Sequence, residues 1–229
     1  MIYNIAIDGP AGAGKSTIAR RVAKELSFVY VDTGAMYRAM ALYLIRKHTD
    51  RANADAIAAD CAGADISIEY RDGEQTVLLN GENVNAYLRT EEVGNMASVS
   101  SANPAVRAKL LDLQRRLAAS MSVVMDGRDI GTTILPDADV KIYLTASSLT
   151  RAKRRYLELQ EKGEECVLEE IRKDIEERDK RDMSREISPL RQAEDAVLVD
   201  SSDMGIQEVV NRILQIYQDK VLSSQKGKK

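Results

Sequence analysis

The residues best suited to chemistry form a short glycine-rich segment near the N-terminus. Residues 9–17 read GPAGAGKST and fit the spacing G-x-x-x-x-G-K-[ST] of a phosphate-binding P-loop. Because its residues are small, consecutive backbone N–H groups can turn inward around a polyphosphate. Lys15 can reach the outer phosphates, and the Ser16 hydroxyl can ligate Mg²⁺. We therefore predict a binding site for ATP phosphates made of Gly9, Pro10, Ala11, Gly12, Ala13, Gly14, Lys15, Ser16 and Thr17.

The segments on either side of this loop support that prediction. Residues 2–7 form an apolar run that is typical of a buried strand, and residues 16–26 repeat apolar side chains at helical spacing. A helix that begins at the loop directs its positive N-terminal end toward a bound anion. The alternative, an accidental match in a surface glycine loop, is disfavoured because strand, loop and helix occur in the order that a P-loop requires.

The rest of the chain alternates apolar runs with helical patterns, which predicts an α/β protein with a parallel sheet and helices on both faces. A β-hairpin around Asp72 and Gly73 interrupts this alternation. We expect a three-layer fold with a central parallel five-stranded sheet and a small β-containing insert. The five predicted strands are residues 2–7, 28–31, 122–125, 140–144 and 196–199.

Size and composition exclude several classes of function. The 229 residues suffice for one domain, residues 1–229, and the net charge of −3 gives no overall basic field for nucleic acid. Cys61 and Cys166 fit no metal spacing and are expected to be reduced thiols of a cytoplasmic protein. The chain has no apolar run of membrane-spanning length. The single histidine, His48, follows two basic residues at a predicted helix end, so catalysis by histidine is not expected.

Charged residues interrupt the apolar stripe of a helix predicted from about residue 167 to 185. The stripe continues onto Arg178, Asp182 and Arg185. One interpretation is an exposed helix end with ion pairs, each worth about 0.2–0.5 kcal/mol. The other is a site for an anionic ligand near the P-loop. The helix before it carries Arg151, Arg154 and Arg155, which could lie on a solvated face. Alternatively, arginines there could stabilise the transferring phosphoryl group, and a lid at about residues 147–166 that bears Arg154 could exclude water.

Two polar clusters follow predicted strands: residues 32–38, which read DTGAMYR, and residues 126–129, which read DGRD. Open α/β sheets bind ligands at the carboxyl ends of their strands. Such clusters are often simple turns. Because each contains an arginine beside a P-loop, a second anionic substrate is the better interpretation.

Five segments together resemble the bacterial cytidylate kinases, a family of nucleoside monophosphate kinases. They are residues 7–17 (IDGPAGAGKST), 32–38 (DTGAMYR), 95–107 (NMASVSSANPAVR), 126–132 (DGRDIGT) and 177–182 (ERDKRD), and the likeness extends over nearly the whole chain. The resemblance implies phosphoryl transfer from ATP to CMP or dCMP with Mg²⁺, a P-loop kinase fold, a monophosphate-binding lobe at about residues 33–110 and the lid named above.

The resemblance also implies a set of site residues. The monophosphate site would comprise Thr33, Tyr37, Arg38, Ser98, Arg107, Arg128, Asp129, Arg178, Asp182 and Arg185. The catalytic residues would be Lys15, Arg128, Arg185 and, in the lid, Arg154. The phosphate of CMP is already anionic at neutral pH, so no general base is expected.

The chemistry of cytosine agrees with this set. Its pairing edge presents an amino donor at N4 and acceptors at N3 and O2, whereas uracil presents an acceptor at O4 and a donor at N3. A carboxylate from Asp129 with donors from Arg107 and Ser98 would therefore prefer cytosine. We assign Arg38, Arg128 and Arg185 to phosphate groups, and Asp182 with Arg178 to the ribose.

Other functions are open to the sequence. A different P-loop kinase, for UMP, AMP or a metabolite such as shikimate, would share the first motif but not the Ser98, Arg107 and Asp129 set. A nucleotide-dependent switch would not need two arginine-bearing strand ends, and the chain has no Asn-Lys-x-Asp stretch for guanine. RNA binding by the arginine-rich helices conflicts with their interleaved acidic residues. We expect a monomer that binds ATP and CMP or dCMP, without nucleic acid or membrane partners.

Overall fold

The computed structural model describes residues 1–71 and 74–226 and divides into two compact units. One unit holds Tyr3–Phe28 and the chain from Val123 onward, and the other holds Val29–Ser122. The chain contains a five-stranded sheet in the order β2-β6-β1-β7-β8 and a three-stranded sheet in the order β3-β4-β5. The predicted α/β fold with a parallel five-stranded central sheet is thereby confirmed.

The first unit contains four strands of the central sheet, namely β1 (Asn4–Asp8), β6 (Val123–Gly127), β7 (Val140–Thr145) and β8 (Val197–Asp200). β1 pairs in parallel with β6 on one side and with β7 on the other, and β7 pairs in parallel with β8. The side chains of Ile5, Ala6 and Ile7 have no exposed surface. Such a continuous buried run is typical of a parallel strand that is covered on both faces.

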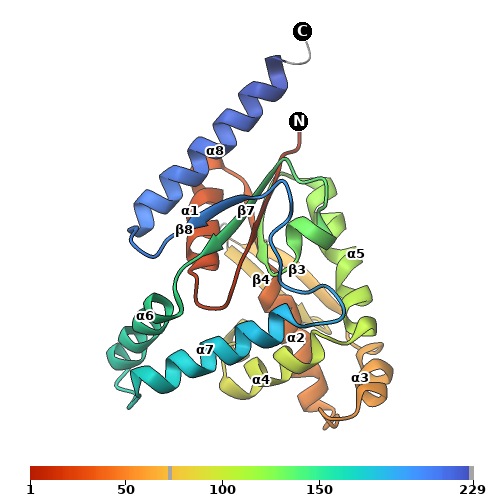
Figure 1. Ribbon diagram of the computed structural model, residues 1–229. Coiled ribbons are helices and arrows are strands. Elements are labelled where there is room, and N and C mark those ends of the chain that lie inside the picture. The colour runs from red at the N-terminus through yellow and green to blue at the C-terminus, as the bar shows by residue number, and fades with distance from the viewer. Residues whose placement is uncertain (72–73, 227–229) are drawn as a thin grey trace. The chain divides into compact units, whose positions relative to one another are not determined.

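The helices of the first unit are α1 (Lys15–Leu26), α6 (Ser148–Glu161), α7 (Leu168–Met183) and α8 (Ile206–Lys226), with a short π-helical turn, η2 (Ile130–Ile134). α1 buries the stripe Ile18, Ala19 and Val22 and runs beside α8 (Figure 1). Tyr217 of α8 contacts Phe28 edge-to-face with ring centroids 5.7 Å apart. This aromatic contact fixes the chain just after α1, where Ser27 adopts a left-handed conformation and ends the helix.

The second unit begins with β2 (Val29–Asp32) and α2 (Thr33–Arg46). Its other elements are α3 (Ala54–Cys61), β3 (Ile66–Arg71), β4 (Glu74–Leu79), β5 (Glu82–Asn83), a 3₁₀ turn η1 (Asn85–Tyr87), α4 (Glu91–Ser100) and α5 (Pro104–Ser120). β3 and β4 form the predicted antiparallel hairpin, whose predicted turn at residues 72–73 lies outside the described residues. The predicted N-cap of α5 is confirmed, because the Asn103 side chain accepts a hydrogen bond from the N–H of Ala105.

Side-chain hydrogen bonds fix the start of α2 to the hairpin within this unit. The Asp32 carboxylate caps α2 by accepting from the N–H of Ala35 at 2.9 Å. The amide of Gln75 in β4 accepts from the Asp32 N–H at 2.8 Å and donates to the Asp32 carbonyl at 3.2 Å. The hairpin therefore holds the segment that precedes Thr33, Tyr37 and Arg38.

Two features differ from the sequence expectations. The charged helix predicted to reach residue 185 ends at Met183, because Ser184 leaves the helical conformation, so Arg185 lies beyond α7. α4 was not anticipated between the hairpin and α5, and it carries Ser98. The predicted lobe, residues 33–110, falls within the second unit. The predicted single domain and lid stay predictions.

Candidate active site

The register of the central strands brings the P-loop and the 126–129 cluster to one edge of the sheet. Asp8, the last residue of β1, pairs with Gly127 of β6 and with Tyr143 of β7. Because the strands are parallel, the segments that follow Asp8 and Gly127 leave the sheet in the same direction. The P-loop and Arg128 therefore begin side by side in the first unit.

The P-loop backbone requires glycine at its two ends. Gly9 has φ 150°, and a Cβ atom there would lie 1.9 Å from the carbonyl oxygen of Leu144 in β7. Gly14 has φ 84° and precedes the first residue of α1, where no side-chain cap is present. The loop thus leaves β1 in close contact with β7 and turns directly into the N-terminus of α1, where uncapped N–H groups favour an anion.

Lys15 is the first residue of α1, and its side chain is 6% exposed. Its Nζ donates to the carbonyl of Pro10 at 2.8 Å, so the ammonium group folds over the loop. Burial and the neighbouring Arg128 guanidinium lower the pKa of Lys15 well below its usual value, whereas Asp126 and Asp8 act in the opposite direction. A polyphosphate in the loop would supply the negative charge that favours the ammonium form.

Ser16 and Asp126 form a pair of oxygen donors beside the loop. The Ser16 hydroxyl donates to Oδ2 of Asp126 at 2.9 Å, although 110 residues separate them in sequence. Among the described residues no three His, Cys, Asp or Glu side chains cluster in a way that could hold a metal. Mg²⁺ commonly binds through one or two protein oxygens, substrate phosphates and waters, so a hydroxyl and a carboxylate fit it. The sequence interpretation named only Ser16. The acidic residue at the end of an apolar strand was the available signal for Asp126.

Asp8 fixes the segment that follows the 126–129 cluster. Its two carboxylate oxygens accept from the N–H groups of Ile130 at 2.8 Å and Gly131 at 2.7 Å. Burial raises the pKa of Asp8 to about 6, even though these two hydrogen bonds lower it. Asp8 was not among the predicted site residues, yet it anchors the backbone directly after Asp129.

Three predicted substrate-binding residues of the first unit meet at one carboxylate. Asp182 is 2% exposed and accepts from Nε of Arg128 at 2.9 Å, and it pairs with Nη2 of Arg185 at 2.5 Å. Burial raises the pKa of Asp182, but the positive charges of Arg128 and Arg185 outweigh burial and lower it overall. Arg178 adds to this lowering from the preceding turn of α7. These charges therefore form a buried cluster and not an exposed helix end.

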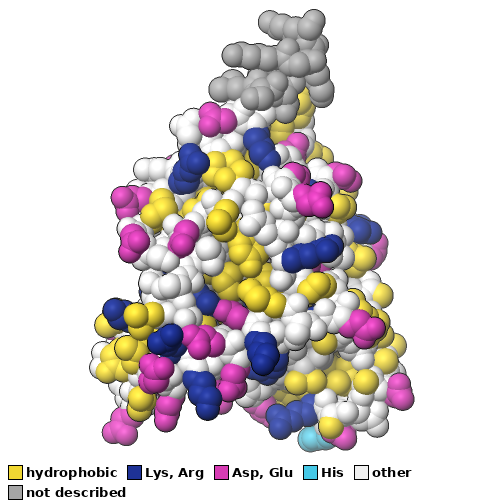
Figure 2. Space-filling view, in the orientation of Figure 1, with side chains coloured by type: hydrophobic (Ala, Val, Ile, Leu, Met, Phe, Trp, Pro, Cys, Tyr) yellow, Lys and Arg dark blue, Asp and Glu magenta, His cyan; other side chains and the backbone are white. Residues whose placement is uncertain are grey.

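Arg154 lies elsewhere in the first unit. Its guanidinium donates to the carbonyl of Ser201 at 2.7 Å and to the Ser201 hydroxyl at 3.3 Å, just after β8. The structure thus does not join Arg154 to the Asp182 cluster, and its catalytic role stays a prediction. Figure 2 shows basic and acidic side chains interspersed where Figure 1 places α6 and α7, without a uniform basic patch.

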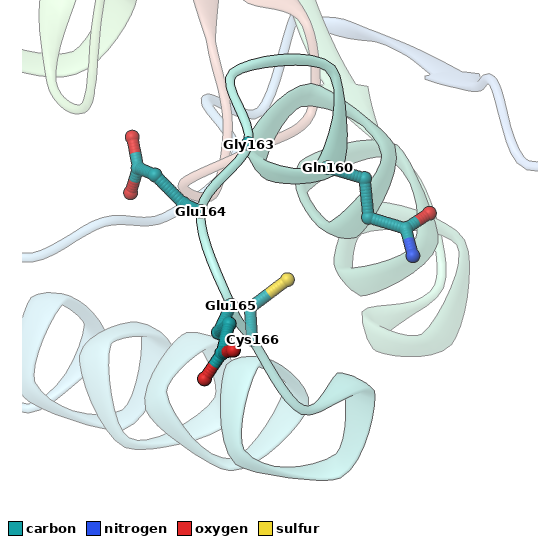
Figure 3. A pocket seen from close by; sticks show the side chains of 5 residues that line it. All are labelled: Gln160, Gly163, Glu164, Glu165 and Cys166. Atoms are coloured by element: carbon teal, nitrogen blue, oxygen red, sulfur yellow. The ribbon is translucent and has the colours of Figure 1, made fainter.

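The connection between α6 and α7 borders an open hollow of about 360 Å³ lined by Gln160, Gly163, Glu164, Glu165 and Cys166. Figure 3 shows these residues around the turn, with Glu164 and Gln160 pointing in opposite directions. Two carboxylates and no basic side chain line it. Such a lining repels phosphate, so this hollow is a poor candidate for the nucleotide.

Asp129 is buried in the first unit, and the second unit contains the other predicted substrate-binding residues, Thr33, Tyr37, Arg38, Ser98 and Arg107. The Arg107 guanidinium lies 5.8 Å from the centre of the Tyr37 ring and donates to the carbonyl of Ser101. This contact joins the start of α5 to α2. Thr33 is 3% exposed at the start of α2, and Ser98 lies on α4, which packs against α2. Arg38 folds back within 3.1 Å of the position that a Cβ atom of Gly34 would occupy.

Comparison with known proteins identifies the family of this chain. The family model for cytidylate kinase matches residues 5–219. The chain belongs to the cytidylate kinase family. A cytidylate kinase from Lactobacillus gasseri is 48% identical over 219 residues, which cover 96% of this chain and 95% of the relative. One from Desulfitobacterium hafniense is 49% identical over 217 residues, covering 95% and 93%.

This membership confirms the resemblance on which the sequence interpretation relied. The match includes the P-loop, the 126–129 cluster and α7, the elements that position the buried charges of the first unit. In the part of the chain that the structure describes, none of the helices has the length and apolar character needed to cross a bilayer.

Proposed function

We propose that this cytidylate kinase transfers the γ-phosphoryl group of ATP to a phosphate oxygen of CMP or dCMP, yielding ADP and CDP or dCDP. The observation that supports the proposal most is that the P-loop and the arginine-bearing 126–129 cluster leave the central sheet at the same edge. A phosphate cradle beside buried arginines suits a reaction between two anionic substrates.

The donor site would be the P-loop, with its backbone N–H groups and Lys15 on the ATP phosphates. Ser16 and Asp126 would hold Mg²⁺, which neutralises charge on the β- and γ-phosphates when bound. In this arrangement the Ser16 hydroxyl, now donating to Asp126, would turn its lone pairs toward the cation.

The residues of the acceptor site would divide by role. Asp129, Arg107 and Ser98 would read cytosine, and Arg38, Arg128 and Arg185 would bind phosphate groups. Asp182, which already holds Arg128 and Arg185, would orient both guanidinium groups while binding a ribose hydroxyl with Arg178. The remaining members of the proposed acceptor site are Thr33 and Tyr37, and Arg154 would act from the lid after closure.

Catalysis would depend on alignment and electrostatic stabilisation. The attacking phosphate oxygen carries no proton at neutral pH, so the site needs no general base. Lys15 and the arginines would stabilise the negative charge on the equatorial oxygens of the transferring group. Because no general base is needed, the predicted site residues include no histidine.

A coupled assay of ADP release across CMP, dCMP, UMP and AMP tests the proposal. We expect kcat/KM to be highest with CMP or dCMP, and Lys15→Ala to lower kcat by about 10³-fold because it removes charge from the donor phosphates. Lys24→Ala is the matched control, since Lys24 is an exposed residue of the same helix. Full turnover by Lys15→Ala, or faster turnover with AMP or UMP, would contradict the proposal.

The metal assignment has its own test. Removing divalent cations with EDTA should abolish turnover, and added Mg²⁺ should restore it. Asp126→Asn should raise the Mg²⁺ concentration that gives half-maximal activity, since an amide oxygen is a weaker ligand than a carboxylate. A cytoplasmic location, a monomeric state and the absence of nucleic-acid partners stay predictions.

A further inference from the structure

Arg151 of α6 is a buried cation whose guanidinium joins three segments of the first unit. Its side chain is 6% exposed. Nε donates to the carbonyl of Ala146 at 2.9 Å, and Nη1 donates to the carbonyl of Ala11 at 2.8 Å. Nη2 donates to Oδ2 of Asp179 in α7 at 2.6 Å. Each nitrogen of the group thus has a partner in a different segment.

A planar guanidinium is suited to this arrangement. Its N–H groups point in fixed directions within one plane, so three acceptors can be held at once. A lysine has one nitrogen and would satisfy fewer of them. A buried cation of this kind is weak evidence for stability, because desolvation opposes the attraction between the charges. A contribution to stability therefore does not by itself explain why Arg151 holds three acceptors.

The hydrogen bond from Arg151 to the carbonyl of Ala11 orients the P-loop. In a trans peptide the C=O and the following N–H point in opposite directions. Holding the carbonyl of Ala11 toward Arg151 therefore directs the N–H of Gly12 away from α6. The approach is close, since a Cβ atom on Gly12 would lie 3.5 Å from the Cβ of Arg151. Arg151 thereby selects one orientation of a peptide in the phosphate cradle.

The hydrogen bond from Arg151 to Asp179 reaches α7, the helix that carries Asp182. Asp179 is 13% exposed and lies one turn before Asp182 on α7. Residues three apart on a helix share a face. Asp182 holds Arg128 and Arg185. A shift of α7 caused by movement of Arg151 would therefore move both guanidinium groups.

We infer that Arg151 is a positioning residue that couples occupancy of the P-loop by ATP to binding of CMP through Asp179 and α7. The inference rests on the proposed function. A nucleotide that orders the P-loop also fixes the carbonyl of Ala11. Because the Arg151 guanidinium binds both this carbonyl and Asp179, the position of α7 is restricted as well. Coupling between two ligands is reciprocal, so CMP must tighten ATP binding by the same factor.

The test is the dissociation constant of a non-hydrolysable ATP analogue with Mg²⁺, measured by calorimetry with and without saturating CMP. In the wild type we expect CMP to tighten analogue binding by about fivefold or more. In Asp179→Asn the ratio should fall to within twofold of one. Analogue binding without CMP should change less than threefold, because the hydrogen bond from Arg151 to Ala11 is kept.

Asp112→Asn is the matched control, because the same substitution there removes an exposed ion pair with Arg116. It should leave the coupling ratio at the wild-type value. Arg151→Lys serves as a second variant if Asp179→Asn proves unstable in urea unfolding. It should weaken analogue binding and also lower the ratio, since lysine cannot hold all three acceptors.

A wild-type ratio near one, or an unchanged ratio in a folded Asp179→Asn or Arg151→Lys variant, would overturn the inference. A role in stability alone would lower the urea midpoint and leave the ratio intact. The proposed function fails separately, by absence of CMP-dependent ADP release from the wild type.

Discussion

Two buried aspartates of the first unit show how neighbours decide the protonation of a carboxyl. Burial raises the pKa of Asp8 to about 6, and its two backbone hydrogen bonds only partly offset this. Burial acts in the same direction on Asp182, yet Arg128 and Arg185 outweigh it and the pKa is lowered. The difference follows from the partners, since guanidinium groups carry full charge and backbone N–H groups are dipoles.

The raised pKa of Asp8 predicts a pH dependence of stability. Between its unfolded value of 3.8 and about 6, the folded state binds more protons than the unfolded state. The stability from this group is therefore fully present below pH 3.8 and is lost as pH rises through 6. The free energy of unfolding of the wild type, relative to Asp8→Asn, should increase by roughly 1 kcal/mol from pH 7 to pH 5.

Urea unfolding of the two proteins at both pH values measures this difference. Asp8→Asn keeps the size of the side chain but loses one of the two backbone hydrogen bonds, because its NH₂ group cannot accept. That loss does not depend on pH, so it cancels when the two pH values are compared. An equal pH-dependent change in Asp137→Asn, which alters an exposed carboxyl, would contradict the assignment to Asp8.

A second prediction at this scale concerns recognition of the base. Asp129→Ala should lower the ratio of kcat/KM for CMP over UMP by about tenfold or more, since a matched hydrogen-bond pair is worth about 1–3 kcal/mol of discrimination. In Asp129→Asn the amide can donate to O4 of uracil, so the ratio should fall further toward UMP. A ratio that stays at the wild-type value in both variants would remove Asp129 from base recognition.

At the scale of elements, the junction between β1 and the P-loop depends on one glycine. The Cβ atom of an alanine at Gly9 would lie 1.9 Å from the Leu144 carbonyl, and this acceptor belongs to the backbone of β7. β7 is held by β1 up to Tyr143 and by β8 at Leu144, so moving the carbonyl would disrupt this pairing. The loop must therefore shift away from the sheet to relieve the contact.

We expect Gly9→Ala to lower the free energy of unfolding by about 1–3 kcal/mol or more and to weaken ATP binding. Gly94→Ala is the matched control, because Gly94 lies inside α4 with no atom within 4 Å of the added Cβ. That variant should be more stable by about 0.5–1 kcal/mol, since alanine restricts the unfolded chain. Urea unfolding measures both, and equal effects would contradict the proposed contact.

At the scale of the whole molecule, bound ligands should stabilise the folded protein against unfolding. A ligand that binds only the folded state at 100 times its Kd adds about 2.7 kcal/mol to the free energy of unfolding. CMP and a non-hydrolysable ATP analogue with Mg²⁺ should therefore each raise Tm, and UMP should raise it less. Differential scanning calorimetry measures these shifts.

The Lys15→Ala variant separates the two sites in the same experiment. Its Tm shift with the ATP analogue should fall, because Lys15 lies over the P-loop, while its shift with CMP should persist. Loss of both shifts together would contradict separate donor and acceptor sites.

The sequence alone determined the elements whose signals are local. The P-loop is contiguous, its glycines are required by the backbone, and the strand and helix on either side have clear periodicity. The five strands and the hairpin were predicted for the same reason, because alternating or continuous apolar runs report burial directly. The end of α7 at Met183 was missed, since the helical spacing of the stripe continues in the sequence as far as Arg185.

Tertiary structure alone decided which charged residues are buried and what they contact. Arg151 and Arg154 are similar in sequence context, yet one reaches Ala11, 140 residues away, and the other reaches Ser201. Only the hydrogen bond from Ser16 identifies Asp126 as a candidate metal ligand. Likewise, only the contact with Arg128 shows that Asp182 is a buried partner of an arginine distant in sequence. The environment of a charge is set by groups distant in the chain, and the pattern around it in the sequence does not contain them.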